Sequence, residues 1–251
     1  MHKLLLELNV HFPYQSSVNL LLGEYKVSFI SRLVDFLLEG DEQSSWNLVE
    51  IYKNGELLLD SHLFYTAITD AMYEVGKLWE KNYITVAQEH IASNVCVLLL
   101  NKYSLLSDKI YKEEEKGLQK KNKALFLCIE GEEHSIGCRI VSNIFREHGW
   151  NTRYIGANVP FQECVSYAMS WRPKVIGLSA SILYNIPNLV KTIETLSKLE
   201  DKPDIIVGGR LTTLFDIKSY CEEEFVVIRN LIELNEWLLS YKNCKNIYVF
   251  N

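Results

Sequence analysis

The sequence has no long apolar segment. Its opening, Met1-His2-Lys3-Leu4-Leu5-Leu6-Glu7, holds one lysine and a three-residue apolar run, which is too short for a secretory signal peptide. No later window reaches the roughly 18 uncharged apolar residues that a membrane-spanning helix requires. We therefore expect a cytoplasmic protein with no membrane partner.

The chain also lacks the short motifs of several common sites. Its 6 cysteines are scattered without a C-x-x-C pair, so without an export signal we expect reduced thiols rather than a disulfide framework. Neither G-x-G-x-x-G nor G-x-x-x-x-G-K-[ST] occurs, so dinucleotide and nucleoside triphosphate sites lack their glycine pattern. The net charge of −6 argues against a nucleic-acid surface, so direct DNA binding is not expected.

What the sequence does contain begins with helical periodicity over residues 25–107, after an unplaced N-terminal extension of residues 1–24. Apolar residues recur at three- and four-residue steps from about Tyr25, and Glu39-Gly40-Asp41 ends this first helix. Three further helices are predicted, near residues 46–54, 61–79 and from Thr85 past Leu100. Short connections between consecutive helices indicate an antiparallel four-helix bundle.

The second half of the chain has a different pattern. Residues 108–123 are dominated by charge and are predicted as an exposed linker. Short apolar runs then alternate with helical stretches over residues 124–251. The runs are 124–129, 152–155, 174–179, 204–207 and 225–228. This alternation predicts an α/β domain with a doubly wound parallel sheet, Rossmann-like or flavodoxin-like.

Candidate binding residues follow several of the predicted strands. His134 and its neighbours come after the first run, and Gly156, Ser179 and the pair Gly208-Gly209 end later ones. The carboxyl ends of parallel strands lie at one edge of a sheet, and ligands of open α/β sheets bind there. These residues are therefore expected to share one binding edge.

His134 is the central candidate, although a single loop histidine is often ordinary polar surface. Glu132 can reach back to the imidazole and hold the proton on its second ring nitrogen, which fixes the tautomer. Gly137 leaves room for a large flat group near the backbone. One histidine suits a single axial bond to a metal carried by a cofactor, since a free metal ion would need three or four protein ligands.

These residues resemble the cobalamin-binding domain family, whose pattern is D-x-H-x-x-G, then a strand-end serine, then a glycine pair. The match comprises residues 132–137, Ser179 and Gly208-Gly209, with Gly156 and Pro160 also in place. The resemblance implies that His134 binds cobalt from below while the benzimidazole tail lies between sheet and helices. It implies a cofactor-binding set of Glu132, His134, Ser135, Gly137, Gly156, Ser179, Ser181, Gly208 and Gly209.

The resemblance has two departures. Glu132 stands where the family has aspartate and is one methylene longer, so its contact with the imidazole is expected to be rearranged. Ser181 stands where the family often has leucine.

The helical part carries a second resemblance, to the cap bundle of the cobalamin photoreceptors. There a tryptophan, followed ten and eleven residues later by Glu-His, covers the upper face of the cofactor; the matching residues are Trp79, Glu89 and His90. An indole would shield an upper organic ligand, and a carboxylate would hydrogen-bond its polar groups. Glu80 replaces the histidine that captures cobalt in those proteins, and no MerR-type DNA-binding module precedes the first helix.

The sequence therefore predicts a cobalamin-binding sensor rather than an enzyme. In this interpretation it is a photoreceptor that holds adenosylcobalamin, or alternatively methylcobalamin, between cap and sheet domain. It would signal through association with itself or with an unidentified protein partner. One alternative is a corrinoid carrier that passes methyl groups between two methyltransferases. Another is a related module that binds haem or a linear bilin through His134 or Cys96.

Overall fold

The computed structural model describes residues 15–54, 61–114 and 122–246 of the chain. It divides into two compact units, Met1–Tyr103 and Ser104–Asn251. No helix among the described residues is long and apolar enough to cross a membrane.

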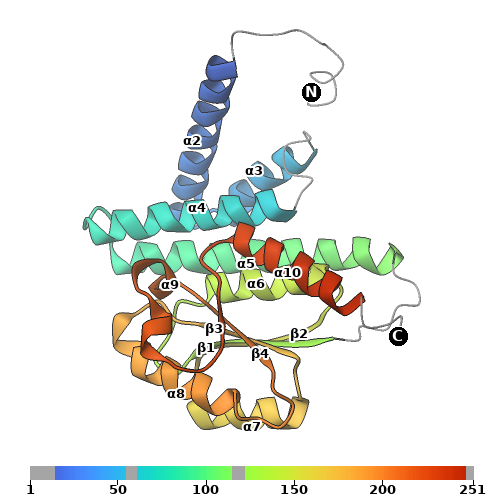
Figure 1. The fold of residues 1–251 in the computed structure, drawn as a ribbon. Coiled ribbons are helices and arrows are strands. Elements are labelled where there is room, and N and C mark those ends of the chain that lie inside the picture. The colour runs from blue at the N-terminus through green and yellow to red at the C-terminus, as the bar shows by residue number, and fades with distance from the viewer. Residues whose placement is uncertain (1–14, 55–60, 115–121, 247–251) are drawn as a thin grey trace. The chain divides into compact units, whose positions relative to one another are not determined.

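The first unit is helical, as the periodicity predicts (Figure 1). Its described residues form α2 (Gln15–Glu39), α3 (Glu42–Asn54), α4 (Ser61–Glu80) and the first part of α5 (Val86–Glu114). α2 packs against both α3 and α4. Fully buried side chains from three helices form the core of the unit, including Leu33, Leu37, Phe64, Tyr65, Ile68 and Leu100.

Two helices are longer than the sequence pattern predicts. α2 begins at Gln15 rather than near Tyr25, because the segment after Pro13 has no helix breaker before Gly23, and one glycine among leucines costs only about 1 kcal/mol. α5 continues to Glu114, so the charged stretch that begins at residue 108 starts as helix. Lysine and glutamate are good helix formers, so a run of charges extends a helix as readily as it forms a linker.

The second unit contains a five-stranded parallel sheet with the order β2-β1-β3-β4-β5. The strands are β1 (Lys123–Ile129), β2 (Asn151–Val159), β3 (Val175–Ser179), β4 (Asp204–Gly208) and β5 (Val226–Val227). Four longer helices accompany them: α6 (Ile136–Glu147), α7 (Phe161–Trp171), α8 (Ile186–Leu196) and α10 (Leu231–Asn246). The short helix α9 (Leu211–Leu214) follows β4. This strand order is the flavodoxin-like one, which confirms the predicted doubly wound sheet.

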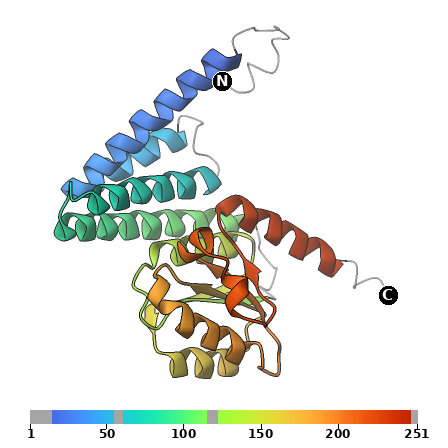
Figure 2. The ribbon, with the colours of Figure 1, turned by 60° about the vertical axis from the view of Figure 1, so that its left-hand side comes forward.

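Apolar residues on both faces of the sheet explain why its strands are continuous hydrophobic runs. Alternate residues of β1 face opposite layers: Leu125 and Leu127 join a cluster with α7 and α8, whereas Phe126 stacks edge to face on Phe145 of α6. Strands buried on both faces read as unbroken apolar segments. Figures 1 and 2 show α7 and α8 together on one face of the sheet.

α10 was not predicted from the sequence. Leu234 and Leu238 are fully buried, Trp237 packs on Phe145, and the Tyr241 hydroxyl donates to Asp204 Oδ2 at 2.8 Å. These buried residues follow a helical spacing, which is the signal that marks this segment as an amphipathic helix. The predicted turn at residues 11–14 and the terminal apolar run after Asn246 lie outside the described residues.

Candidate functional site

The predicted binding residues of the second unit do lie at one edge of the sheet. Cys128 at the end of β1 pairs with Ser179 of β3, and Ser179 pairs with Gly208 of β4. The loop that carries Glu132 and His134 leaves β1 at this same edge and leads into α6. The parallel register therefore brings the histidine, the serine and the glycine pair together, as expected for a ligand site of this fold.

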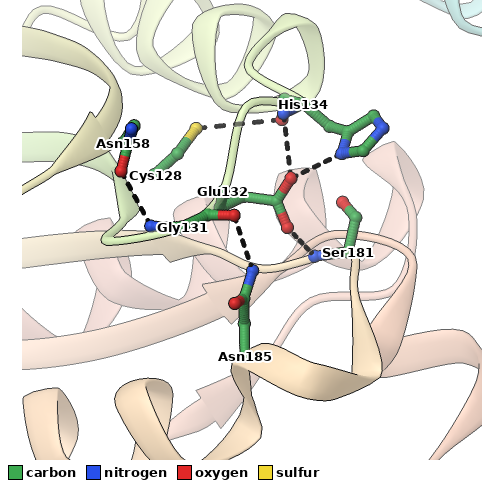
Figure 3. Close-up of polar contacts among 7 residues, drawn as sticks. All are labelled: Cys128, Gly131, Glu132, His134, Asn158, Ser181 and Asn185. Carbon is green, nitrogen blue, oxygen red and sulfur yellow. Dashed lines mark hydrogen bonds and ion pairs between the residues drawn. The ribbon is translucent and has the colours of Figure 1, made fainter.

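His134 and Glu132 form a direct pair, shown in Figure 3. His134 Nδ1 lies 2.6 Å from Glu132 Oε1, and the Glu132 side chain is fully buried while that of His134 is 65% exposed. An ionised carboxylate can only accept hydrogen bonds, so Nδ1 carries the proton. When the ring is neutral, its lone pair is on Nε2, which suits a bond to a metal.

Glu132 accepts from two further donors. The backbone N–H of His134 donates to Oε1 at 2.9 Å, and the backbone N–H of Ser181 donates to Oε2 at 2.5 Å. Burial by itself raises the pKa of Glu132, but the hydrogen bonds from His134 and Ser181, with the charge of His134, bring that pKa below its ordinary value. The longer side chain thus keeps its contact with the imidazole, and its second oxygen reaches the chain after β3.

The glycines at this edge serve different purposes. Gly209 has a φ of +105°, and an added Cβ would lie 2.3 Å from the carbonyl oxygen of Ala180, so the backbone itself requires glycine. Gly156 has a φ of +123°, beside an irregularity in the pairing of β1 with β2. At Gly137 an added Cβ would meet nothing within 4 Å. The protein leaves that space open, as a large flat ligand would require.

The structure also reveals contacts that the motif did not indicate. Asn158 Oδ1 accepts from the Gly131 N–H at 2.8 Å, and Asn185 Nδ2 donates to the Gly131 carbonyl at 3.0 Å. Ser135 precedes α6, and its carbonyl oxygen accepts from the Arg139 N–H.

Trp79, Glu89 and His90 gather at the connection between α4 and α5 of the first unit. α4 ends in a Schellman motif, in which Tyr83 N–H donates to Leu78 O and Asn82 N–H to Trp79 O, both at 2.9 Å. α5 begins with a capping box: Thr85 N–H donates to Gln88 Oε1 at 2.9 Å, and Gln88 N–H to Thr85 Oγ1 at 3.2 Å. These hydrogen bonds define the short turn between the two helices.

Trp79 is not a core residue, since it is 47% exposed. Tyr83 and Val86, at the same connection, are also exposed apolar side chains. Glu89 accepts from the Ser93 hydroxyl at 2.7 Å and lies 3.6 Å from His90 Nε2. An exposed indole beside an anchored carboxylate suits contact with a ligand that is partly apolar and partly polar. The arrangement of a cofactor between Trp79 and His134 stays a prediction.

The potential metal ligands elsewhere are scattered. Within the described ranges, no group of three or more histidine, cysteine, aspartate or glutamate side chains could hold a metal ion. Five cysteines are buried and form no disulfide among the described residues: Cys96, Cys128, Cys138, Cys164 and Cys221. The Cys96 thiol is therefore not at the surface, where attachment of a bilin would need it. His134 offers one exposed donor nitrogen, as a single axial ligand would.

Comparison with known proteins bears on this site. A B12 binding domain model matches residues 122–229, and a second B12 binding domain model matches residues 30–101. Dimethylamine corrinoid protein 3 of Methanosarcina mazei is 33% identical over 87 residues, which are 34% of this chain and 52% of that protein. The HTH-type transcriptional repressor CarH of Myxococcus xanthus is 28% identical over 116 residues, 46% of this chain and 36% of that protein.

The solved structure of the Methanosarcina barkeri monomethylamine corrinoid protein has the same fold. It superimposes with a TM-score of 0.67 at 17% identity, covering 85% of this chain and 98% of that chain. The chain matches about half of the length of the Methanosarcina mazei relative and about a third of that of CarH. The two domain models together match most of the chain, in its helical part and its sheet part, and this protein belongs to the B12-binding domain family.

Proposed function

We propose that this protein is a corrinoid carrier that passes methyl groups between methyltransferase partners. The sequence offered this function as the alternative to a photoreceptor, and the relatives support it better, since one is a dimethylamine corrinoid protein and the solved structure is a monomethylamine corrinoid protein. The observation that carries the proposal is the exposed His134 imidazole, whose Nδ1 is held by the buried Glu132 in a B12-binding domain.

In this proposal the residues of the sheet edge hold the lower side of the cofactor. His134 donates its Nε2 lone pair to cobalt, while Glu132 keeps the ring in the correct tautomer and increases its donor strength. Ser179, Gly208 and Gly209 line the path of the tail. The cobalt of the bound corrinoid supplies the chemistry, accepting a methyl group and releasing it to a partner.

The helical unit serves as the cover of the upper face. Trp79, Tyr83 and Val86 provide exposed apolar surface at the α4–α5 connection, which excludes water from an organic upper ligand. Glu89, anchored by Ser93, and His90 provide polar contacts. A carrier would require this cover to move aside when a partner approaches, and its methyl-loaded cofactor would be methylcobalamin rather than adenosylcobalamin.

The first test is loading and spectroscopy of the full chain. We expect about one cobalt per chain after reconstitution and an absorption spectrum with the cobalt ligated by histidine. His134→Ala should lose the histidine-ligated spectrum, whereas His148→Gln, at the end of α6, should keep it. A spectrum that His134→Ala leaves unchanged would refute the proposed site, and a haem or bilin spectrum would refute the cofactor.

The second test separates the carrier from the photoreceptor. The reduced, corrinoid-loaded protein is incubated with purified corrinoid methyltransferases and methylated amines, and methylation of cobalt is followed by absorption. Turnover supports the carrier. In a parallel arm the protein is loaded with adenosylcobalamin in darkness and illuminated. A light-dependent change of elution volume without any methyl transfer would favour the photoreceptor and overturn our proposal.

A further inference from the structure

The two peptide groups that flank Gly131, one residue before Glu132, are each bound by an asparagine side chain. Asn158, at the end of β2, accepts from the Gly131 N–H at 2.8 Å. Asn185, just before α8, donates to the Gly131 carbonyl at 3.0 Å. Figure 3 shows both contacts beside the Glu132–His134 pair. Residues from two separate crossovers of the sheet thus bind two successive peptide groups of the loop.

The backbone conformation at position 131 and the closeness of Asn185 both favour glycine there. Its φ is +83°, and an added Cβ would lie 2.9 Å from Asn185 Oδ1. Asn158 has a φ of +49°, a left-handed conformation that asparagine and aspartate tolerate better than other side chains. The Asn158 N–H also donates to the carbonyl of Glu132 at 2.8 Å. Asn158 therefore contacts both Gly131 and Glu132, and Asn185 is buried.

The consequence for His134 follows from the chain direction. The two peptide groups that flank Gly131 determine where the Glu132 side chain leaves the backbone. The Glu132 carboxylate in turn determines where the imidazole points, since it binds both Nδ1 and the N–H of His134. A small rotation at Gly131 would move the carboxylate away from the Ser181 N–H. The direction of the His134 Nε2 lone pair thus depends on the two asparagines.

We propose that Asn158 and Asn185 are positioning residues for the axial histidine, fixing the peptide groups on the two sides of Gly131 so that His134 Nε2 is aimed at the cobalt. This inference rests on the proposed corrinoid site. It assigns the two asparagines a role in the metal–histidine bond that is separate from their contribution to folding.

The test is a double-mutant cycle with His134 in the full chain. The probe is cobinamide, a corrinoid without the nucleotide tail, and the measured quantity is its Kd. Asn185→Ala and Asn158→Ala should each raise Kd by roughly two- to tenfold, the factor of one hydrogen bond, with the larger effect at the buried Asn185. In a His134→Ala background the same changes should leave Kd unaltered. Equal weakening in both backgrounds would show a merely structural role and overturn the inference.

Aspartate substitutions distinguish the two asparagines, because Asn158 accepts a hydrogen bond from Gly131 whereas Asn185 donates one to it. Asn158→Asp keeps the oxygen that accepts from the Gly131 N–H, so it should bind cobinamide as the native protein does. Asn185→Asp replaces the donor by a second acceptor facing the Gly131 carbonyl, so it should raise the Kd for cobinamide at least as much as Asn185→Ala does. Equal Kd values for the two aspartate variants would contradict the proposed geometry, and this comparison holds even if an alanine variant does not fold.

A control is Asn122→Ala. Asn122 lies just before β1, at the opposite edge of the sheet, where its Oδ1 accepts from Lys174 Nζ at 2.9 Å. Its replacement should leave Kd unchanged, and a rise equal to that of Asn185→Ala would refute the assignment.

The nitrogen splitting in the electron paramagnetic resonance of the cobalt(II) form reports the His134 bond directly. If the native protein shows no such splitting, the proposed site itself fails, which separates that outcome from failure of the asparagine role.

Discussion

Replacing Glu132 by glutamine is the most direct perturbation of the candidate site in the protein without cofactor. Glu132 is fully buried and accepts from three donors: the His134 ring, the His134 N–H and the Ser181 N–H. Glutamine has nearly the same size but one acceptor oxygen and one amide group. It can therefore satisfy the two His134 donors or the Ser181 donor, while its own amide faces whichever donor remains.

The expected cost follows from this mismatch. A buried donor left without a partner destabilises the folded state by about 1–3 kcal/mol. Removal of the buried charge offsets part of this loss, because the neutral amide costs less to take out of water than the carboxylate. We expect Glu132→Gln to lower the free energy of unfolding by about 1–3 kcal/mol at pH 7, measured by urea denaturation. The control is Glu130→Gln on the same loop. The exposed Glu130 carboxylate accepts from the Phe161 N–H, and its replacement should lower the free energy of unfolding by about 0.5 kcal/mol.

The pH dependence of this difference checks its electrostatic origin. The pKa of Glu132 is lower in the folded protein than its ordinary value, so its contribution is complete above the unfolded pKa of about 4.3. It is lost as the pH falls through the lower, folded pKa. The difference between native and Glu132→Gln proteins should thus be constant from pH 7 to about 5 and shrink below about 4. A glutamine variant as stable as the native protein at pH 7, or a difference that grows in acid, would refute the reasoning.

Three further predictions concern residues elsewhere in the two units. Gly209→Ala should lower stability by about 2–4 kcal/mol in thermal unfolding, because of its positive φ and the close carbonyl oxygen, whereas Gly76→Ala, inside α4 with open space around it, should raise stability by about 0.5–1 kcal/mol. Burial raises the pKa of Cys164 to about 12, so iodoacetamide at pH 8 should modify it only when the protein unfolds, and rapid labelling of the native state would contradict this burial. Trp79→Ala should change the stability of the cofactor-free protein by less than about 1 kcal/mol, whereas the buried Trp46→Ala should cost about 3–5 kcal/mol; similar losses in urea denaturation would place Trp79 in the core.

The sheet was predictable because its central strands β1 and β3 are buried on both faces. Runs such as residues 124–129 have no polar interruption, and the first four runs are each followed by a helical pattern, so most of the order of elements could be read directly. α10 was missed because the exposed apolar residues Ile232 and Leu239 obscure the spacing of its buried residues Leu234 and Leu238. The helix ends were misjudged where charge, rather than apolar periodicity, continued the helix, as at residues 108–114.

The histidine and its carboxylate were predictable because they are two residues apart, and a local pair can be read from spacing. The asparagine contacts were not, since Asn158 and Asn185 lie far along the chain from Gly131 and meet it only through the folding of two crossovers. Their residue type is common in turns, so nothing in the sequence separates these two from asparagines that only form a turn. Spacing reveals local chemistry, whereas positioning contacts require the three-dimensional fold.

The two residues that depart from the family pattern, Glu132 and Ser181, are joined by one hydrogen bond. The extra methylene of Glu132 lets its second oxygen reach the backbone N–H of Ser181 while the first stays on His134. That donor is a peptide group, so a leucine at position 181 would offer it equally. The serine hydroxyl therefore does not compensate for the longer carboxylate; the main chain after β3 does. The second oxygen of the longer glutamate side chain thus faces a donor that every non-proline residue carries.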